Sequence, residues 1–328
     1  MLSIRRIAMI PGMKSPSPPI PQSTPAPYAP PKARFWGYEY VPAERQLLHS
    51  FLSNRLVLGA LAILASLILC AVFAAWIAPA DPLEQILKAR LKPPIWDERG
   101  LSPFYLGTDR LGRDVLSNII FGLRVSLLVG FFAVGISMVI GLTLGLIAGY
   151  SRGFWESFIM RAVDVQLSLP LIMVALCFMV IFGQGLEKMI IVLAITGWAE
   201  YARTVRGTVL SIREKEYVEA AHALGFGPWT IMTKYLLINA VTPVLVLSAV
   251  QVPRVIILEA TLSFLGVGVP VTTPSIGLAI ARGYQVLFSG SWWASIFPGL
   301  ALMLLVACIN VAADWLRDAL EPRSREQV

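Results

Sequence analysis

Two stretches of this sequence, residues 56–80 and 125–151, contain no charged residue. An α-helix needs about 20 apolar residues to cross the hydrocarbon core of a bilayer, so each stretch is long enough to do so. Across the 328 residues, 14% are charged and 56% are hydrophobic, which leaves too little polar surface to cover a water-soluble globule. The chain is therefore predicted to be an integral membrane protein.

Four more segments are candidate spans, although charges interrupt two of them. One begins at Met189 and must continue through Glu200, and another is broken by Pro253 and Arg254. The four segments are 165–186, 189–209, 236–265 and 292–313. Together these observations predict an all-α membrane protein with six transmembrane helices. They divide it into a first helix at 55–80, an outer loop at 81–123 and a five-helix core at 124–316.

The two ends of the chain are predicted to lie outside the helical bundle. Residues 1–54 are rich in proline and are expected to form a disordered tail, with a segment at the membrane surface over 35–55. An even number of spans puts both termini on one side. The lysine and arginine residues of the segment 203–234 and of the C-terminal tail 317–328 predict that this side is cytoplasmic. The loop at 81–123 is also rich in lysine and arginine, which opposes this orientation.

The stretch EYVEAAHALGFG, residues 216–227, is polar and lies between two candidate spans. Its glutamates and alanines favour a helix, and Gly225 sits where a left-handed residue would end it. Pro228 allows a second helix to begin, since proline is tolerated at the first helical position. This element either packs on its own chain or offers a face to another surface. The residues of its one narrow, shallow face are Tyr217, Ala220, Ala221 and Leu224.

The same stretch resembles the EAA motif of the membrane subunits of bacterial ABC importers. That motif has a glycine four residues after its second alanine and a hydrophobic, proline-containing end further on. Leu237 fits this end, and Ile238 stands where the family usually has proline. The residues that match the motif itself are Glu219, Ala220, Ala221 and Gly225.

A second segment, YLGTDRLGRDVLSNIIFGLRVSL at 105–127, resembles the GTDxxGRD signature of the dipeptide, oligopeptide and nickel branch of these importers. The segments WAEYARTVRGTVL, ILEATLSFLGVGV and ADWLRDALEPR are similar to the same branch, so the resemblance extends from the first span to the C-terminus. The signature residues are Gly107, Thr108, Asp109, Gly112, Arg113 and Asp114.

The resemblance implies the type I permease fold of ABC importers, in the bacterial inner membrane. It implies that residues 216–227 form a coupling helix, which sits in a groove on a separate ATPase subunit. The implied partners are a second homologous permease, two cytoplasmic ATPase subunits and an extracytoplasmic solute-binding protein. ATP and Mg²⁺ would bind to the partners, and this chain would bind no cofactor. The cargo would be di- or oligopeptides, with nickel chelates, glutathione or another small solute as alternatives.

The sequence itself contains little material for catalysis. It has no GxxxxGK[ST] phosphate loop, and none of its seven lysines follows a glycine. It has two histidines and no HExxH pattern, and its three cysteines lie within apolar runs, so no metal site is expected. A membrane-embedded enzyme is thereby disfavoured. An ion-coupled secondary transporter that works alone remains the alternative from outside the family.

Charged residues inside predicted spans are costly and are functional hypotheses. Asp164, Glu200 and Arg203 are expected to snorkel or to pair between helices. Arg254 and Glu259 are five residues apart, so they point to different sides of their helix and are not expected to pair with each other. One of these two residues is predicted to line the translocation path or to contact the partner permease.

Two further expectations concern local packing. Asp109, Arg110, Arg113 and Asp114 are expected to form a charge-paired outer turn that orients a following interfacial helix and contacts the binding protein or the partner subunit. Small residues in the second span are expected to permit close contacts between helices that are remade during transport or are part of static packing. These residues are Gly130, Gly135, Gly141 and Gly145.

Overall fold

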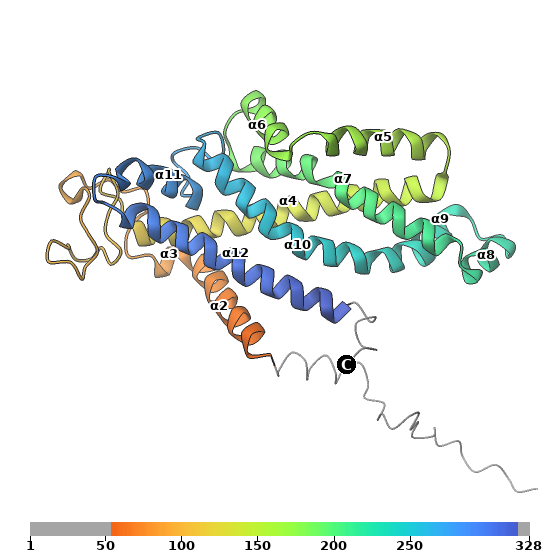
Figure 1. The fold of residues 1–328 in the computed structure, drawn as a ribbon, viewed down its shortest axis with the longest axis horizontal. Helices are drawn as coiled ribbons and strands as arrows, with labels where there is room; N and C mark the ends of the chain where they lie inside the picture. The colour runs from red at the N-terminus through yellow and green to blue at the C-terminus, as the bar shows by residue number, and fades with distance from the viewer. Residues whose placement is uncertain (1–53, 321–328) are drawn as a thin grey trace, which may run out of the picture. The chain divides into compact units, whose positions relative to one another are not determined.

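A computed structural model describes residues 54–320, which form helices and loops without a strand (Figure 1). Three predicted regions lie wholly or partly outside the described residues. They are the N-terminal tail, the surface segment at 35–55 except for its last two residues, and residues 321–328 of the C-terminal tail. The elements are α2 (Arg55–Val72), α3 (Ala74–Ile77), η1 (Leu87–Ala89), α4 (Val115–Ser151), α5 (Phe154–Ser168), α6 (Leu171–Phe182), α7 (Leu186–Arg213), α8 (Glu216–Ala223), α9 (Pro228–Ile231), the π-helical segment η2 (Met232–Leu236), α10 (Leu237–Phe264), α11 (Ile276–Leu287) and α12 (Trp293–Leu320).

Within residues 54–320, four helical segments are long and apolar enough to cross a membrane, namely α2, α4, α12 and the stretch Pro228–Phe264 that contains α9 and α10. The pair α5 and α6 also qualifies if it is taken as one span, but its two helices meet at an angle of 94°. Helix α7 is not among them, because six charged residues are distributed along its 28 positions. The all-helical membrane prediction is confirmed, whereas the count of six spans is not.

The predicted third span at 165–186 is wrong as a single helix. Helix α5 ends at Ser168, Leu169 is extended with φ −99° and ψ 140°, and α6 begins after Pro170. Proline disfavours helical backbone in the residue before it, which explains why the chain turns at Leu169.

Pro253 and Arg254 interrupt the apolar run of the predicted span at 236–265 but do not interrupt its helix. Helix α10 is continuous from Leu237 to Phe264 and contains both Pro243 and Pro253. Proline inside a membrane helix is tolerated where neighbouring helices and side chains satisfy the backbone groups that it frees.

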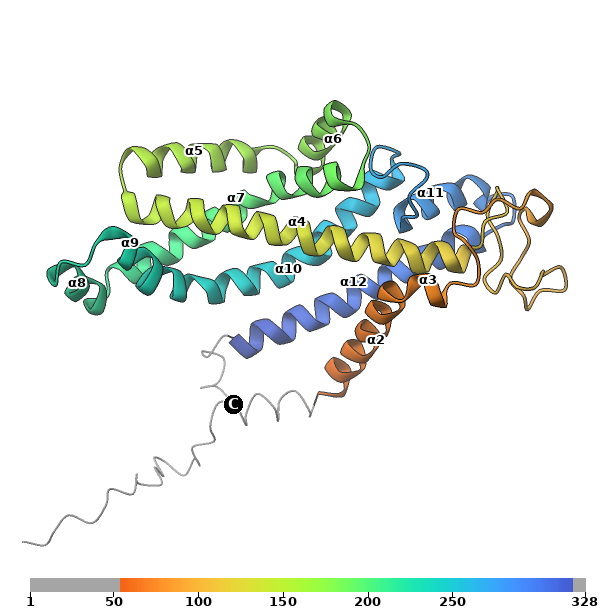
Figure 2. The same ribbon diagram turned by 180° about the vertical axis from the view of Figure 1, so that it is seen from behind.

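The interfacial helix that was predicted after the GTDRLGRD segment is the first part of α4 itself. Helix α4 begins at Val115, within the segment assigned to the outer loop, and continues for 37 residues. At 1.5 Å per residue it is about 55 Å long. It therefore joins the outer loop directly to the opposite end of the bundle, where α8 and α9 lie (Figures 1 and 2).

Helices α4 and α7 pack closely because glycine recurs at every fourth position of α4. A Cβ atom on Gly141 would lie 2.3 Å from the Cβ of Tyr201, and one on Gly145 would lie 2.6 Å from the Cβ of Val205. Gly149 continues the row. No side chain larger than hydrogen fits at these positions, so the predicted close contacts are confirmed for Gly141 and Gly145.

The other two predicted glycines differ from each other. A Cβ on Gly130 would lie 2.9 Å from a side-chain carbon of Ile256 in α10, so this glycine also permits a close contact. Gly135 has no atom within 4 Å of such a Cβ, so its predicted contact within this chain is wrong.

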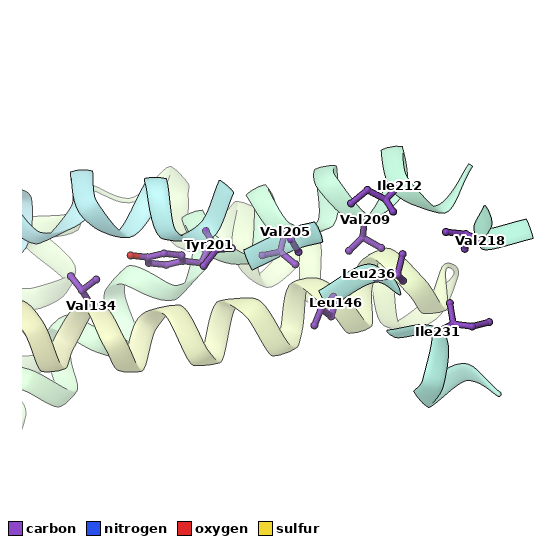
Figure 3. Packing of buried hydrophobic residues seen from close by; sticks show 11 residues of the cluster. Val134, Leu146, Tyr201, Val205, Val209, Ile212, Val218, Ile231 and Leu236 are labelled. Atoms are coloured by element: carbon purple, nitrogen blue, oxygen red, sulfur yellow. The ribbon is translucent and has the colours of Figure 1, made fainter. Parts of the chain in front are cut away.

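A buried apolar cluster attaches α8 and α9 to the long helices (Figure 3). Val218 of α8, Ile231 of α9 and Leu236 of η2 are fully buried. They belong to the same cluster as Val205 and Val209 of α7, so the α8–α9 hairpin is packed against the end of the bundle.

Candidate functional site

The α8–α9 hairpin is shaped by local backbone chemistry. Gly225 has φ +78°, a left-handed conformation that glycine adopts without strain. Its N–H donates to the carbonyl of His222 at 3.0 Å, and the N–H of Phe226 donates to the carbonyl of Ala221 at 3.2 Å. This pair of bonds is the Schellman motif, so the predicted left-handed end of the helix is confirmed.

The second half of the hairpin begins as predicted at Pro228, the first residue of α9. The chain then continues through the π-helical segment Met232–Leu236 into α10 without a loop. Ile238, at the position where the importer motif usually has proline, lies in the first turn of α10.

Helix α8 is held on one side and exposed on the other. Val218 and Ala221 are buried, and the ring of His222 stacks on Tyr150 at the end of α4 with ring centroids 6.3 Å apart. Glu219 is exposed. Of the four predicted motif residues, Glu219, Ala220 and Gly225 are therefore accessible, whereas Ala221 faces the bundle.

Large apolar side chains are exposed around this hairpin, which we call the α8–α9 knob (residues 216–229). Leu224 is 75% exposed and Trp229 is 76% exposed, and Tyr217 and Phe226 also reach solvent. A cluster of exposed apolar residues at one end of a protein indicates a contact surface. Phe226 and Trp229 were not singled out from the sequence, although two aromatic residues beside a polar helix are a readable signal.

The GTDRLGRD segment is folded inward, in contrast to the knob. All six predicted signature residues are buried. The hydroxyl of Thr108 donates to the carbonyl of Ala89 at 2.5 Å and accepts from the N–H of Lys92 at 2.9 Å. The indole N–H of Trp293 donates to the Thr108 carbonyl at 3.2 Å. The segment thus binds the outer loop to the start of α12.

The two aspartates of this segment bind backbone N–H groups. Asp109 accepts from the N–H groups of Leu111 and Arg113 at 2.7 and 3.0 Å. Asp114 accepts from the N–H and the hydroxyl of Ser117 at 2.8 and 2.6 Å, which caps the N-terminus of α4.

The predicted charge-paired turn is therefore wrong. Within residues 54–320, no ion pair forms among the four charged residues of the segment. Arg110 instead donates to the side-chain oxygen of Gln285 in α11 at 2.5 Å, and Arg113 is buried.

The structure separates Arg254 from Glu259, as was predicted. Glu259 is fully buried and accepts hydrogen bonds from the hydroxyls of Ser126, Ser263 and Ser275 at 2.8–2.9 Å. It therefore joins α4, α10 and the start of α11 inside this chain. Arg254 is exposed and approaches Glu200 of α7, with 3.5 Å between its Nη1 and a carboxylate oxygen.

The predicted pairing of charges between helices is confirmed. Arg203 of α7 contacts Asp164 of α5 at 2.5 Å. Arg206 binds one carboxylate oxygen of Glu156 through two nitrogens, at 2.5 and 2.8 Å. These pairs explain how α7 carries many charges and still lies within the bundle.

Comparison with known proteins identifies the family of this chain. The family of binding-protein-dependent transport system inner membrane components matches residues 141–326. The chain belongs to this family. Residues 45–94 of the permease also match the N-terminal TM domain of oligopeptide transport permease C. The permease spans a membrane through several apolar helices, and members of its family are transport subunits rather than enzymes.

Several curated relatives resemble the permease over most of their length. The di/tripeptide transport system permease protein DppC of Pseudomonas aeruginosa is 40% identical over 85% of this chain and 92% of the relative. The dipeptide transport system permease protein DppC of Bacillus subtilis is 38% identical over 83% of both chains. The glutathione transport system permease protein GsiD of Pectobacterium atrosepticum is 35% identical over 85% of this chain and 91% of the relative.

Proposed function

We propose that this permease imports di- or oligopeptides as one subunit of an ATP-driven, binding-protein-dependent transporter. The dipeptide permeases among its relatives support this cargo. Its partners are a second homologous permease, two cytoplasmic ATPase subunits and an extracytoplasmic binding protein. The chain itself binds no cofactor, and ATP and Mg²⁺ bind to the ATPase subunits.

The observation that carries the proposal is the α8–α9 knob. Glu219, Leu224 and Trp229 project from the end of the bundle while Val218 fixes the hairpin to the core. A hairpin that is packed on one side and exposes apolar side chains on the other suits a groove on another protein. In our proposal ATP binding moves the ATPase subunits, the knob moves with them, and the permease pair switches between inward-facing and outward-facing states.

The same proposal includes six spans with both termini in the cytoplasm. Helix α7, the predicted span at 189–209, is counted as a span despite its charges, because the partners of those charges lie on neighbouring helices. The bent pair α5 and α6 counts as one span. If the knob lies in the cytoplasm, the loop before α4 lies on the extracytoplasmic side, because α4 crosses the membrane between them.

The test is charge reversal at Glu219 together with a bulky residue at Gly225. Glu219→Lys and Gly225→Leu should lower cargo-stimulated ATP hydrolysis and uptake at least tenfold in the reconstituted complex, with insertion unchanged. Asp318→Lys is the matched control, because Asp318 is exposed near the end of α12 and lies outside the knob. Unchanged uptake and hydrolysis in both knob variants would show that the knob does not couple the subunits.

The glutathione permease among the relatives makes glutathione the alternative cargo. Competition separates the two: uptake of a labelled dipeptide should fall with excess unlabelled dipeptide and remain with excess glutathione. Vesicles with this chain alone address the ion-coupled alternative, because they should take up neither solute under an ion gradient.

A further inference from the structure

A cavity of about 210 Å³ lies beside the middle of α7. Most of its lining is apolar and comes from α4, α7, α10 and the chain around the α5–α6 turn. Ligand pockets that hold a whole small molecule measure roughly 300–1,000 Å³, so this cavity alone is smaller than such a pocket. Its polar and charged lining residues are Ser137, Gln166, Thr196, Glu200, Gln251 and Arg254.

Both charged residues of the cavity lie deep in their helices. Glu200 is near the midpoint of the 28-residue helix α7, and Arg254 is ten residues before the end of α10, about 15 Å from it. Their side chains are 40% and 62% exposed in the isolated chain. A charge at this depth that faced lipid would cost roughly 2.5–3.5 kcal/mol or more, so both side chains must face water or another protein.

The contact between Glu200 and Arg254 is loose. The distance of 3.5 Å exceeds the 2.5 and 2.8 Å of the two-nitrogen contact between Arg206 and Glu156. An accessible ion pair contributes about 0–1 kcal/mol, so a ligand can replace it at small cost.

Both groups have unused bonding capacity. Arg254 has five N–H donors, and residues 54–320 offer it this one acceptor. The same oxygen of Glu200 accepts from Gln251 and from Arg254, which leaves the second carboxylate oxygen available among the described residues. Gln251 precedes Arg254 by three positions and so lies on the same face of α10.

We infer that Glu200 and Arg254 bind the two ends of a zwitterionic peptide during its passage. The inference rests on the proposed function. The carboxylate of Glu200 receives the terminal ammonium group, and the guanidinium of Arg254 receives the terminal carboxylate, for which its planar fork is suited. Two extended residues span at most about 7 Å, so the loose pair must open to admit a dipeptide. The partner permease encloses the rest of the space.

The test compares three forms of one dipeptide: unmodified, N-formylated and C-amidated. Uptake is measured in the complete reconstituted complex at concentrations that saturate the binding protein with each form. The wild-type complex should take up the unmodified dipeptide fastest. Glu200→Gln should slow its uptake about tenfold and abolish the difference from the N-formylated form. Arg254→Gln should slow uptake of the unmodified dipeptide by a similar factor and abolish its difference from the C-amidated form.

The matched control is the double variant Asp164→Asn, Arg203→Gln. This pair also joins α7 to a neighbouring helix, but it does not line the cavity. It should leave the ratios among the three uptake rates within twofold of those of the wild type. Each variant is judged on the ratio between peptide forms, so a lower amount of folded complex does not affect the result.

Three results would overturn the inference. The first is that Glu200→Gln and Arg254→Gln slow all three forms equally, as expected of a structural ion pair. The second is that both variants leave uptake unchanged. The third is that a wild-type complex that imports dipeptide shows no preference among the forms. Failure of the wild-type complex to import any dipeptide would instead contradict the proposed function itself.

Discussion

The two signature segments of this permease lie at opposite ends of α4 and differ in exposure. The GTDRLGRD segment buries all six of its signature residues, whereas α8 exposes Glu219 and Ala220 and is followed by the exposed Gly225. The first segment therefore closes the outer loop on its own chain, and the second leaves side chains exposed for the contact that we propose with the ATPase subunit. A sequence signature alone does not distinguish these two roles, and burial does.

Two glycines show the same contrast at atomic scale. Gly112 and Gly225 have φ +76° and +78°, so both need the left-handed conformation. A Cβ on Gly112 would lie 1.9 Å from the carbonyl oxygen of Ile86, whereas a Cβ on Gly225 would have no atom within 4 Å. Both glycines therefore need the same left-handed backbone conformation, but only Gly112 lies where a Cβ atom would clash.

The largest effect is expected for Gly112→Ala. The strained φ and the clash with the Ile86 carbonyl together should lower the free energy of unfolding by about 3 kcal/mol or more. Thermal unfolding in detergent measures this loss. The matched control is Gly225→Ala, which should lower the free energy of unfolding by about 1 kcal/mol. Equal losses in the two variants would contradict the contrast between a packed and an exposed glycine.

A smaller effect is expected at Asp114, which caps α4 from a buried position. Asp114→Ala removes the acceptor for Ser117 and should cost about 1–3 kcal/mol of unfolding free energy. Asp114→Asn keeps an acceptor oxygen and should lose less in the same thermal unfolding measurement. If Asp114→Ala unfolds at the wild-type temperature, the outer segment does not stabilise α4.

The smallest effect on stability is expected at Leu224, in the knob. Leu224→Ser changes an exposed side chain and should alter the free energy of unfolding by about 0.5 kcal/mol or less. Cargo-stimulated ATP hydrolysis should nevertheless fall, because a groove on the ATPase subunit loses an apolar contact. Loss of stability comparable to that of Asp114→Ala would place Leu224 in the fold rather than in a contact surface.

The sequence was sufficient where the structure depends on local chemistry. Gly225 and Pro228 define the turn between α8 and α9 because a left-handed residue and a first-turn proline act within a few positions. The all-helical membrane class followed from runs of uncharged residues in the same way.

The sequence was insufficient where distant residues decide the outcome. It placed a span at 189–209, but it could not identify the residues of α5 and α10 that pair with the charges of α7. The aspartates of the outer segment bind backbone N–H groups instead of arginines, a choice that depends on the folded turn. The cavity beside Glu200 also needed the structure, since five helices contribute residues to its lining.

The most direct measurement of the central claim is site-specific cross-linking of the knob. In a chain whose native cysteines Cys70, Cys177 and Cys308 are replaced by alanine, Leu224→Cys is compared with Tyr105→Cys, an exposed position of the outer loop. Leu224→Cys should cross-link to the ATPase subunit and resist an impermeant maleimide added outside intact cells, while Tyr105→Cys should react with the maleimide and form no such cross-link. Labelling of Leu224→Cys from outside, or the absence of its cross-link in an assembled complex, would contradict the account.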